Sequence, residues 1–118
     1  MDQSARWQDV LRKLRVIDEH FVEDEAGLDF DPSLTCRLDV RTAALVQLGA
    51  MVATGSAAVG LEWSASRALA TGATEDEIVD VLLVVGPVSG LGRVVAAVAD
   101  VSRALDYDVE AALEATDE

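Results

Sequence analysis

The chain has 118 residues, which suffice for one domain and are too few for two ordinary domains. It carries 22 acidic and 9 basic residues, and its net charge of −13 disfavours nucleic acid as a partner because phosphate backbones would be repelled. Hydrophobic residues make up 51% of the sequence but aromatic residues only 4%. This apolar surplus exceeds what a small domain buries by itself, so we expect a homo-oligomer.

The cysteine content and the longest uncharged run bear on where the protein works. Cys36 is the only cysteine, so no internal disulfide can form, as expected in the reducing cytoplasm. The first residues lack the basic-then-apolar pattern of a secretion signal. Residues 42–61 carry no charge, but polar residues such as Gln47 and Thr54 interrupt them, which indicates two core helices rather than a membrane span. We therefore expect a cytoplasmic protein without a membrane partner.

Hydrophobic periodicity predicts an amphipathic helix at the start of the chain, over residues 4–22. Its apolar side chains recur at three- and four-residue spacing: Trp7, Val10, Leu11, Leu14, Ile17 and Phe21. Residues 23–38 should form an acidic connector, because Gly27 and the Asp31-Pro32 pair discourage helix.

Two further helices are predicted on either side of a glycine corner. Asp39 is a suitable N-cap for a helix over residues 40–53. The core stripe of that helix is Leu45, Leu48 and Val52. Gly55-Ser56 marks a tight corner, and the helix that follows should run to residue 71 and end at a left-handed Gly72.

The next segment begins with a capping box, in which Thr74 and Glu77 satisfy each other's backbone amides. We expect this box to open a helix over residues 78–85, which is apolar except for Asp80 and therefore should be buried on most sides. Gly86-Pro87 is expected to interrupt that helix.

The last part of the chain contains two more predicted helices. Gly90 and Gly92 are expected to allow close backbone approach before a helix over residues 91–105. Asp108 should cap a short tail helix over residues 109–115. No segment alternates polar and apolar residues as a strand does, so the fold class is all-α with about six helices.

The segment from residue 38 to residue 105 resembles the carboxymuconolactone decarboxylase family, which also includes the alkylhydroperoxidase D-like proteins. The motifs that carry the resemblance are Leu38-Asp39-x-Arg41-Thr42, Arg67-Ala68-Leu69-Ala70-x-Gly72-Ala73-Thr74-x-x-Glu77-Ile78, Val81-Leu82-Leu83 and Gly90-x-x-Arg93. The resemblance implies an alkylhydroperoxidase D-like helical fold, a single domain over residues 1–118, and a trimer or a multiple of it.

The resemblance also implies where the family's chemistry would lie. Peroxidase members carry Cys-x-x-Cys and then a histidine eight residues before the glycine that ends the helix. Counted back from Gly72, these positions hold Ala57, Gly60 and Ser64, and the relay glutamate falls on Ala44 or Leu45. Neither a thiolate nor the histidine that the decarboxylase branch retains is present there. The resemblance therefore predicts loss of both reactions.

Four residues of the same helix are the remaining site candidates. Glu62 and Ser64 are the candidate catalytic pair, as acid or base and as hydrogen-bond donor, while Trp63 and Arg67 are candidates for binding a substrate. The alternative is an ordinary helix, with Trp63 in a core or interface and the charged residues solvated or paired. We expect no cofactor and no metal.

Three functions remain open from the sequence. The first is an oligomeric small-molecule-binding or accessory protein. The second is a cofactor-free lyase or isomerase that acts on a small cyclic or acidic substrate through Glu62 and Ser64. The third is a purely structural assembly subunit.

Other reactive residues are better explained by structure than by chemistry. Cys36 has no partner base, and His20 is expected at the surface. The acidic connector lacks the spacing of a calcium loop. Arg93 is expected to form a salt bridge at a helix terminus or an interface.

Overall fold

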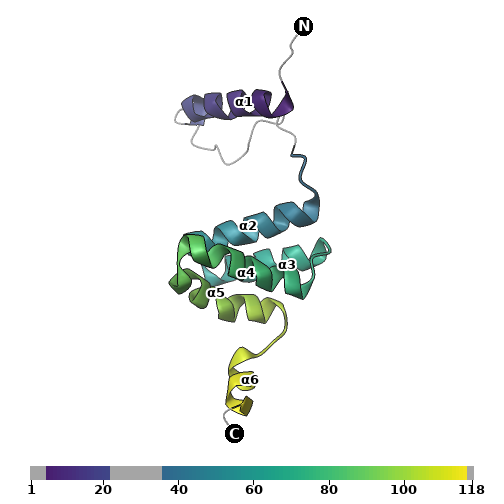
Figure 1. The fold of residues 1–118 in the computed structure, drawn as a ribbon, viewed down its shortest axis with the longest axis vertical. Coiled ribbons are helices and arrows are strands. Elements are labelled where there is room, and N and C mark those ends of the chain that lie inside the picture. Colours follow the sequence, from purple (N-terminus) through teal and green to yellow (C-terminus); the bar gives the residue numbers. More distant parts are fainter. Residues whose placement is uncertain (1–4, 22–35, 117–118) are drawn as a thin grey trace. The chain divides into compact units, whose positions relative to one another are not determined.

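The computed structural model describes residues 5–21 and 36–116, and every regular element in these residues is an α-helix. By contacts the chain divides into two units, residues 1–37 and residues 38–118. The first unit contains α1 (Arg6–Phe21) (Figure 1). The second contains α2 (Val40–Thr54), α3 (Ala58–Ala70), α4 (Glu75–Ser89), α5 (Leu91–Ala104) and α6 (Val109–Thr116). The all-α prediction is confirmed, whereas a single domain over the whole chain stays a prediction.

The helix ends are set by the caps that the sequence predicts. The Asp39 carboxylate accepts the backbone N–H of Thr42 at 2.7 Å, which satisfies one free amide at the start of α2. Thr74 and Glu77 form the capping box at the start of α4. Asp108 accepts the N–H of Ala111 at 3.0 Å at the start of α6. These three caps are confirmed.

The core of the second unit lies between α2, α3, α4 and α5. Helix α2 packs against α3 and α4, and α5 packs against the same two helices. The buried apolar residues are Ala44, Leu48, Val52, Leu61, Ala65, Ala68, Ala73, Ile78, Leu82, Ala97 and Val101. Alanine is frequent among them, so the helices can approach closely. At Gly49, for example, a Cβ atom would lie 3.3 Å from Val85.

The corner between α2 and α3 requires a glycine because of its backbone. Gly55 has φ +73°, a left-handed conformation that side chains disfavour. The guanidinium of Arg93, from α5, lies where a side chain at position 55 would be, but it is the end of a flexible, exposed side chain that can move aside. Gly72 likewise has φ +102° at the end of α3, as predicted.

The prediction that Gly90 and Gly92 allow close backbone approach is wrong. A Cβ atom at either position would meet nothing within 4 Å. Gly90 is instead required by its own backbone, since its φ is +97° between α4 and α5. The glycine of this region that lies near another helix is Gly86, whose Cβ would lie 3.6 Å from Val94.

The predicted interruption of α4 at Gly86-Pro87 is also wrong, because the helix continues to Ser89. Proline has no N–H to donate to the carbonyl four residues earlier, which here belongs to Leu83. Both Pro87 and Leu83 are on the exposed side of α4, where water can satisfy that carbonyl. The proline also lies in the last turn, so few helical hydrogen bonds follow it.

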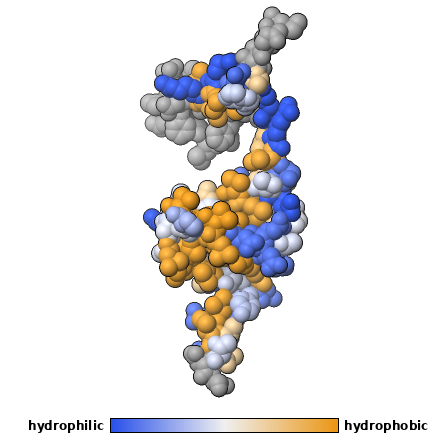
Figure 2. Space-filling view, viewed as in Figure 1, coloured by the Kyte–Doolittle hydropathy of each residue, from blue (hydrophilic) through white to orange (hydrophobic). Residues whose placement is uncertain are grey.

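The expected burial of α4 on most sides is a third error. Ile78 and Leu82 are buried, but Val79, Leu83, Val84 and Val88 are 42%, 68%, 73% and 89% exposed. The second unit supplies helices to cover one side of α4 only. Figure 2 shows hydrophobic residues gathered over the helices of the second unit. We call these four valine and leucine residues the outer face of α4.

Helix α4 begins at Glu75, three residues before the predicted start at residue 78, because it follows directly on the Thr74 cap. The other boundaries agree with the predictions to within two residues, which is the usual uncertainty of helix ends. The predicted acidic connector, residues 23–38, lies mostly outside the described residues. Among the helices that the structure does describe, none has the length and hydrophobicity needed to cross a membrane.

Candidate functional site

The four predicted site residues all lie on α3, but they point in different directions. Ser64 is only 3% exposed and sits among the buried apolar residues of α3, whereas the Glu62 side chain is 41% exposed. Two residues correspond to about 200° around a helix. The structure therefore does not bring the Glu62 carboxylate and the Ser64 hydroxyl together.

The Glu62 carboxylate faces a basic residue of another helix. Its Oε2 atom lies 3.7 Å from Nη1 of Arg103 on α5, and the same nitrogen donates to Asp100 at 3.1 Å. This arrangement matches the alternative in which Glu62 is a paired residue of an ordinary helix. Arg103 was not found from the sequence, because its partner is 41 positions away and no short motif connects them.

Trp63 and Arg67 do form a pair, as their four-residue spacing suggests. The guanidinium carbon of Arg67 lies 5.6 Å from the centre of the indole ring, within cation–π range. Arg67 also donates to Gln47 of α2 at 2.7 Å. Trp63 is 59% exposed. The pair thus connects α3 to α2 at the surface, and its guanidinium already has a hydrogen-bond acceptor.

A second charged contact joins two of the motifs quoted above. Nη1 of Arg41, in the first turn of α2, donates to Oε2 of Glu77, in the first turn of α4, at 2.8 Å. The backbone N–H of Thr74 donates to the same carboxylate and, with Arg41, holds the pKa of Glu77 below its ordinary value. The pKa of Asp39 is lowered mainly by the backbone N–H of Thr42. These contacts fix the starts of α2 and α4 and engage both carboxylates.

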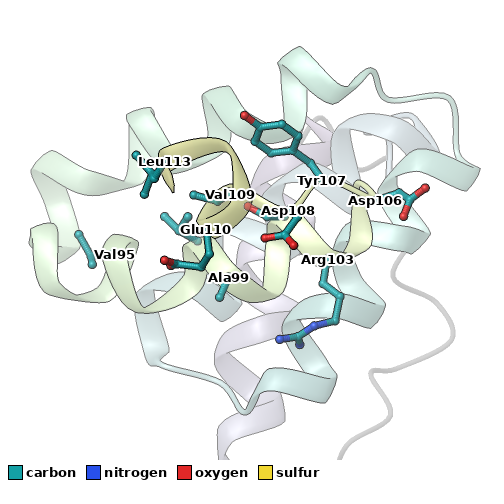
Figure 3. Close-up of a pocket in the computed structure, with 11 residues that line it drawn as sticks. Val95, Ala99, Arg103, Asp106, Tyr107, Asp108, Val109, Glu110 and Leu113 are labelled. Atoms are coloured by element: carbon teal, nitrogen blue, oxygen red, sulfur yellow. The ribbon is translucent and has the colours of Figure 1, made fainter. Parts of the chain in front are cut away.

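A pocket of about 650 Å³ lies between α5 and α6, away from the predicted site (Figure 3). Its apolar lining is Val95, Val98, Ala99, Val109 and Leu113, and its polar lining is Ser102, Arg103, Asp106, Tyr107, Asp108 and Glu110. None of the four predicted residues lines it. Arg103 nevertheless connects it to Glu62. Of the residues that line this pocket, sequence reasoning had singled out only Asp108, as a helix cap.

The other reactive residues stay apart from one another. Cys36 is a free, exposed thiol. His20 belongs to α1, but its side chain lies outside the described residues, as do residues 23–35 of the acidic connector. Arg93 lies at the C-terminal end of α2 and forms no ion pair within the described part of the chain. Within residues 5–16 and 36–116, no three His, Cys, Asp or Glu side chains are grouped to hold a metal ion.

Comparison with known proteins agrees with this fold. Searches of curated proteins and of solved structures gave no match. The model of the carboxymuconolactone decarboxylase family matches residues 26–101, more than half of the chain. The match includes α2, α3 and α4 entirely and most of α5. The chain therefore belongs to the carboxymuconolactone decarboxylase family.

Proposed function

We propose that this protein is a self-associating small-molecule-binding or accessory member of its family that has lost the thiol peroxidase centre and the decarboxylase histidine. The observation that carries the proposal is the environment of position 64. Position 64 is a serine, which is buried among the apolar residues of α3. The nearest carboxylate on that helix, that of Glu62, faces Arg103. No proton donor and acceptor converge there.

The chemistry of the side chains supports the loss of both reactions. Ala57 and Gly60 cannot supply a thiolate, and the thiolate is the nucleophile in thiol-based peroxide reduction. The Ser64 hydroxyl cannot replace an imidazole, because an alcohol does not ionise near neutral pH and so cannot act as both acid and base there. The lyase alternative would need Glu62 and Ser64 to reach one substrate, and their divergence on α3 argues against it.

The outer face of α4 supports self-association. The outer face of α4 forms an apolar arc on one side of the helix, and the charged Asp80 lies within it. A contiguous apolar surface of this kind is uncommon on monomeric proteins and marks interaction sites. A second copy would cover these side chains and would account for the apolar surplus of the composition.

Activity measurements test the loss of chemistry. The purified protein is incubated with cumene hydroperoxide and excess dithiothreitol, and separately with 4-carboxymuconolactone. We expect no peroxide consumption and no decarboxylation above the buffer rate. Turnover in either assay that increases in proportion to protein concentration would overturn the proposal. If Ser64→Ala has the same residual rates of peroxide consumption and decarboxylation as the wild type, those rates do not come from position 64.

Sedimentation equilibrium tests the self-association. We expect the wild-type protein to be oligomeric and Leu83→Asp to shift it toward the monomer. Leu83 is exposed in the single chain, so this variant should still fold, which circular dichroism checks. Ser66→Asp, which adds the same charge at an exposed position of α3, is the matched control. A monomeric wild-type protein, or equal dissociation by both variants, would contradict this part of the proposal.

A further inference from the structure

We propose that the pocket between α5 and α6 binds a small amphipathic organic cation, with an apolar body and a protonated amine. This inference rests on the proposed small-molecule-binding function and names the chemical class of the ligand. It is carried by the lining of the pocket, which combines an apolar wall with an excess of carboxylates.

The size and the apolar wall fit a small organic molecule. A volume of about 650 Å³ lies within the range of ligand sites in proteins. Val95 of α5 and Leu113 of α6 line it, and they are 61% and 55% exposed although both are apolar. In Figure 3 they lie at the same end of the pocket. Covering these two side chains with an apolar ligand would remove them from water.

The charges select a cation. Asp106, Asp108 and Glu110 line the pocket against a single basic residue, Arg103, which leaves 1 − 3 = −2 formal charges. Arg103 is already neutralised by Asp100 and Glu62. Its side chain extends away from the acidic groups in Figure 3. An anionic ligand would therefore find no available positive charge in this lining.

Glu110 is a carboxylate of the lining that can pair with an amine. It is exposed and forms no ion pair with any residue that the structure describes. Asp108, by contrast, already accepts the N–H of Ala111 as a helix cap. Tyr107 adds an exposed aromatic ring, whose face attracts organic cations. The net charge of −13 attracts the same ligands at longer range.

Three probes with the same body and different charge test the inference. Phenylbutylamine, phenylbutanol and phenylbutyrate are titrated into the full chain, with affinity from calorimetry and location from amide chemical shifts in NMR. We expect the amine to bind most tightly, on the order of tenfold more tightly than the carboxylate. The shifts should concentrate in residues 95–113, and added salt should weaken the amine selectively.

Matched variants locate the charge that is responsible. Glu110→Gln should weaken amine binding about two- to fivefold, as expected for an exposed ion pair. Glu114→Gln removes the same charge from the same helix outside the pocket lining, and it should leave the affinity unchanged. Leu113→Ser should weaken all three probes. Circular dichroism confirms that each variant is folded.

Several outcomes would overturn the inference. Equal affinity for the amine and the carboxylate would show that the pocket does not select by charge. Equal effects of Glu110→Gln and Glu114→Gln would show that only the overall negative charge of the protein attracts the amine. No binding by any probe, together with dissociation of an oligomer by Leu113→Ser, would mean that a second copy fills the groove. Peroxidase or decarboxylase turnover would instead overturn the proposed function, whatever the amine does.

Discussion

The interior between α2 and α3 and the outer face of α4 are built from the same kinds of side chain but have different surroundings. Leu48 of α2 and Ala65 of α3 are fully buried within one chain, whereas Leu83 and Val84 of α4 are 68% and 73% exposed. All four residues belong to segments of the sequence that are nearly free of charge. Hydrophobicity alone therefore does not distinguish a helix face that the chain buries from one that it leaves exposed.

The difference follows from the number of helices available. Helices α3 and α4 cover α2 on two sides, and α5 covers α3 and α4. None of these helices covers the outer face of α4, which stays exposed. If a second copy covers that face, the two regions should differ in one measurable way. The loss of unfolding free energy caused by a substitution in α2 or α3 should be independent of protein concentration. The loss caused by a substitution on the outer face of α4 should increase with protein concentration.

The largest effect is expected when a leucine is shortened to alanine in each of the two regions. Leu48→Ala removes a fully buried side chain and should lower the free energy of unfolding by about 2–5 kcal/mol at every protein concentration. Leu83→Ala should cost less than about 0.5 kcal/mol in dilute solution and more as the wild type associates. Urea unfolding at two well-separated protein concentrations measures both. A concentration-independent loss at Leu83 would mean that no partner covers α4.

The next effect concerns the corner that places α3 against α2. Gly55→Ala should cost about 1–2 kcal/mol because of its left-handed backbone, and little more for the contact with Arg93, whose exposed guanidinium can move aside. In an Arg93→Ala background the cost of the same change should therefore be nearly unchanged, and a double-mutant cycle in urea measures the difference. Gly92→Ala, where a Cβ atom meets nothing within 4 Å, is the control and should not destabilise. A clearly smaller cost in the Arg93→Ala background would show that Arg93 cannot move aside.

Local features of the fold could be predicted from the sequence, whereas features that depend on packing could not. Caps and glycine corners are local, so Asp39, Thr74 and Gly55 could be identified from neighbouring residues. The burial of α4 depends on how many helices surround it, which no local pattern records. The continuation of α4 past Pro87 depends on whether the carbonyl of Leu83 faces water, which is again a property of the packed fold.

The candidate site was harder to predict than the fold. The contact between Trp63 and Arg67 is local, because residues four apart share a helix face. The pairing of Glu62 with Arg103, and of Arg41 with Glu77, joins residues that are far apart in the sequence. The pocket between α5 and α6 combines residues of two helices, and of its lining the sequence indicated only the Asp108 cap.

A smaller effect should come from the cap that begins α4. Thr74→Ala removes the hydroxyl that accepts the N–H of Glu77 at 3.0 Å, and should lower the free energy of unfolding by about 1 kcal/mol. This cost should not change with protein concentration, although α4 also carries the exposed apolar face, because the cap acts within one chain. Ser66→Ala, at an exposed position of α3, should change stability by less than about 0.5 kcal/mol. A Thr74→Ala effect that grows with concentration would place the start of α4 in the interface as well.

The smallest effect should come from acid, through the two carboxylates at the starts of α2 and α4. The folded-state pKa values of Asp39 and Glu77 lie below their ordinary values, because backbone N–H groups donate to both carboxylates. The unfolded chain therefore binds more protons as the pH falls, so the stabilisation is complete at neutral pH and is lost below about pH 4. Asp39 is exposed and Glu77 half-buried at the surface, so the loss should be modest. Urea unfolding between about pH 7 and pH 3 should show a flatter dependence for Asp39→Asn with Glu77→Gln than for wild type, whereas Glu114→Gln should keep the wild-type slope. If the double variant loses as much stability in acid as the wild type, the acid sensitivity arises elsewhere, and the outer face of α4, which depends on association, becomes the region to examine.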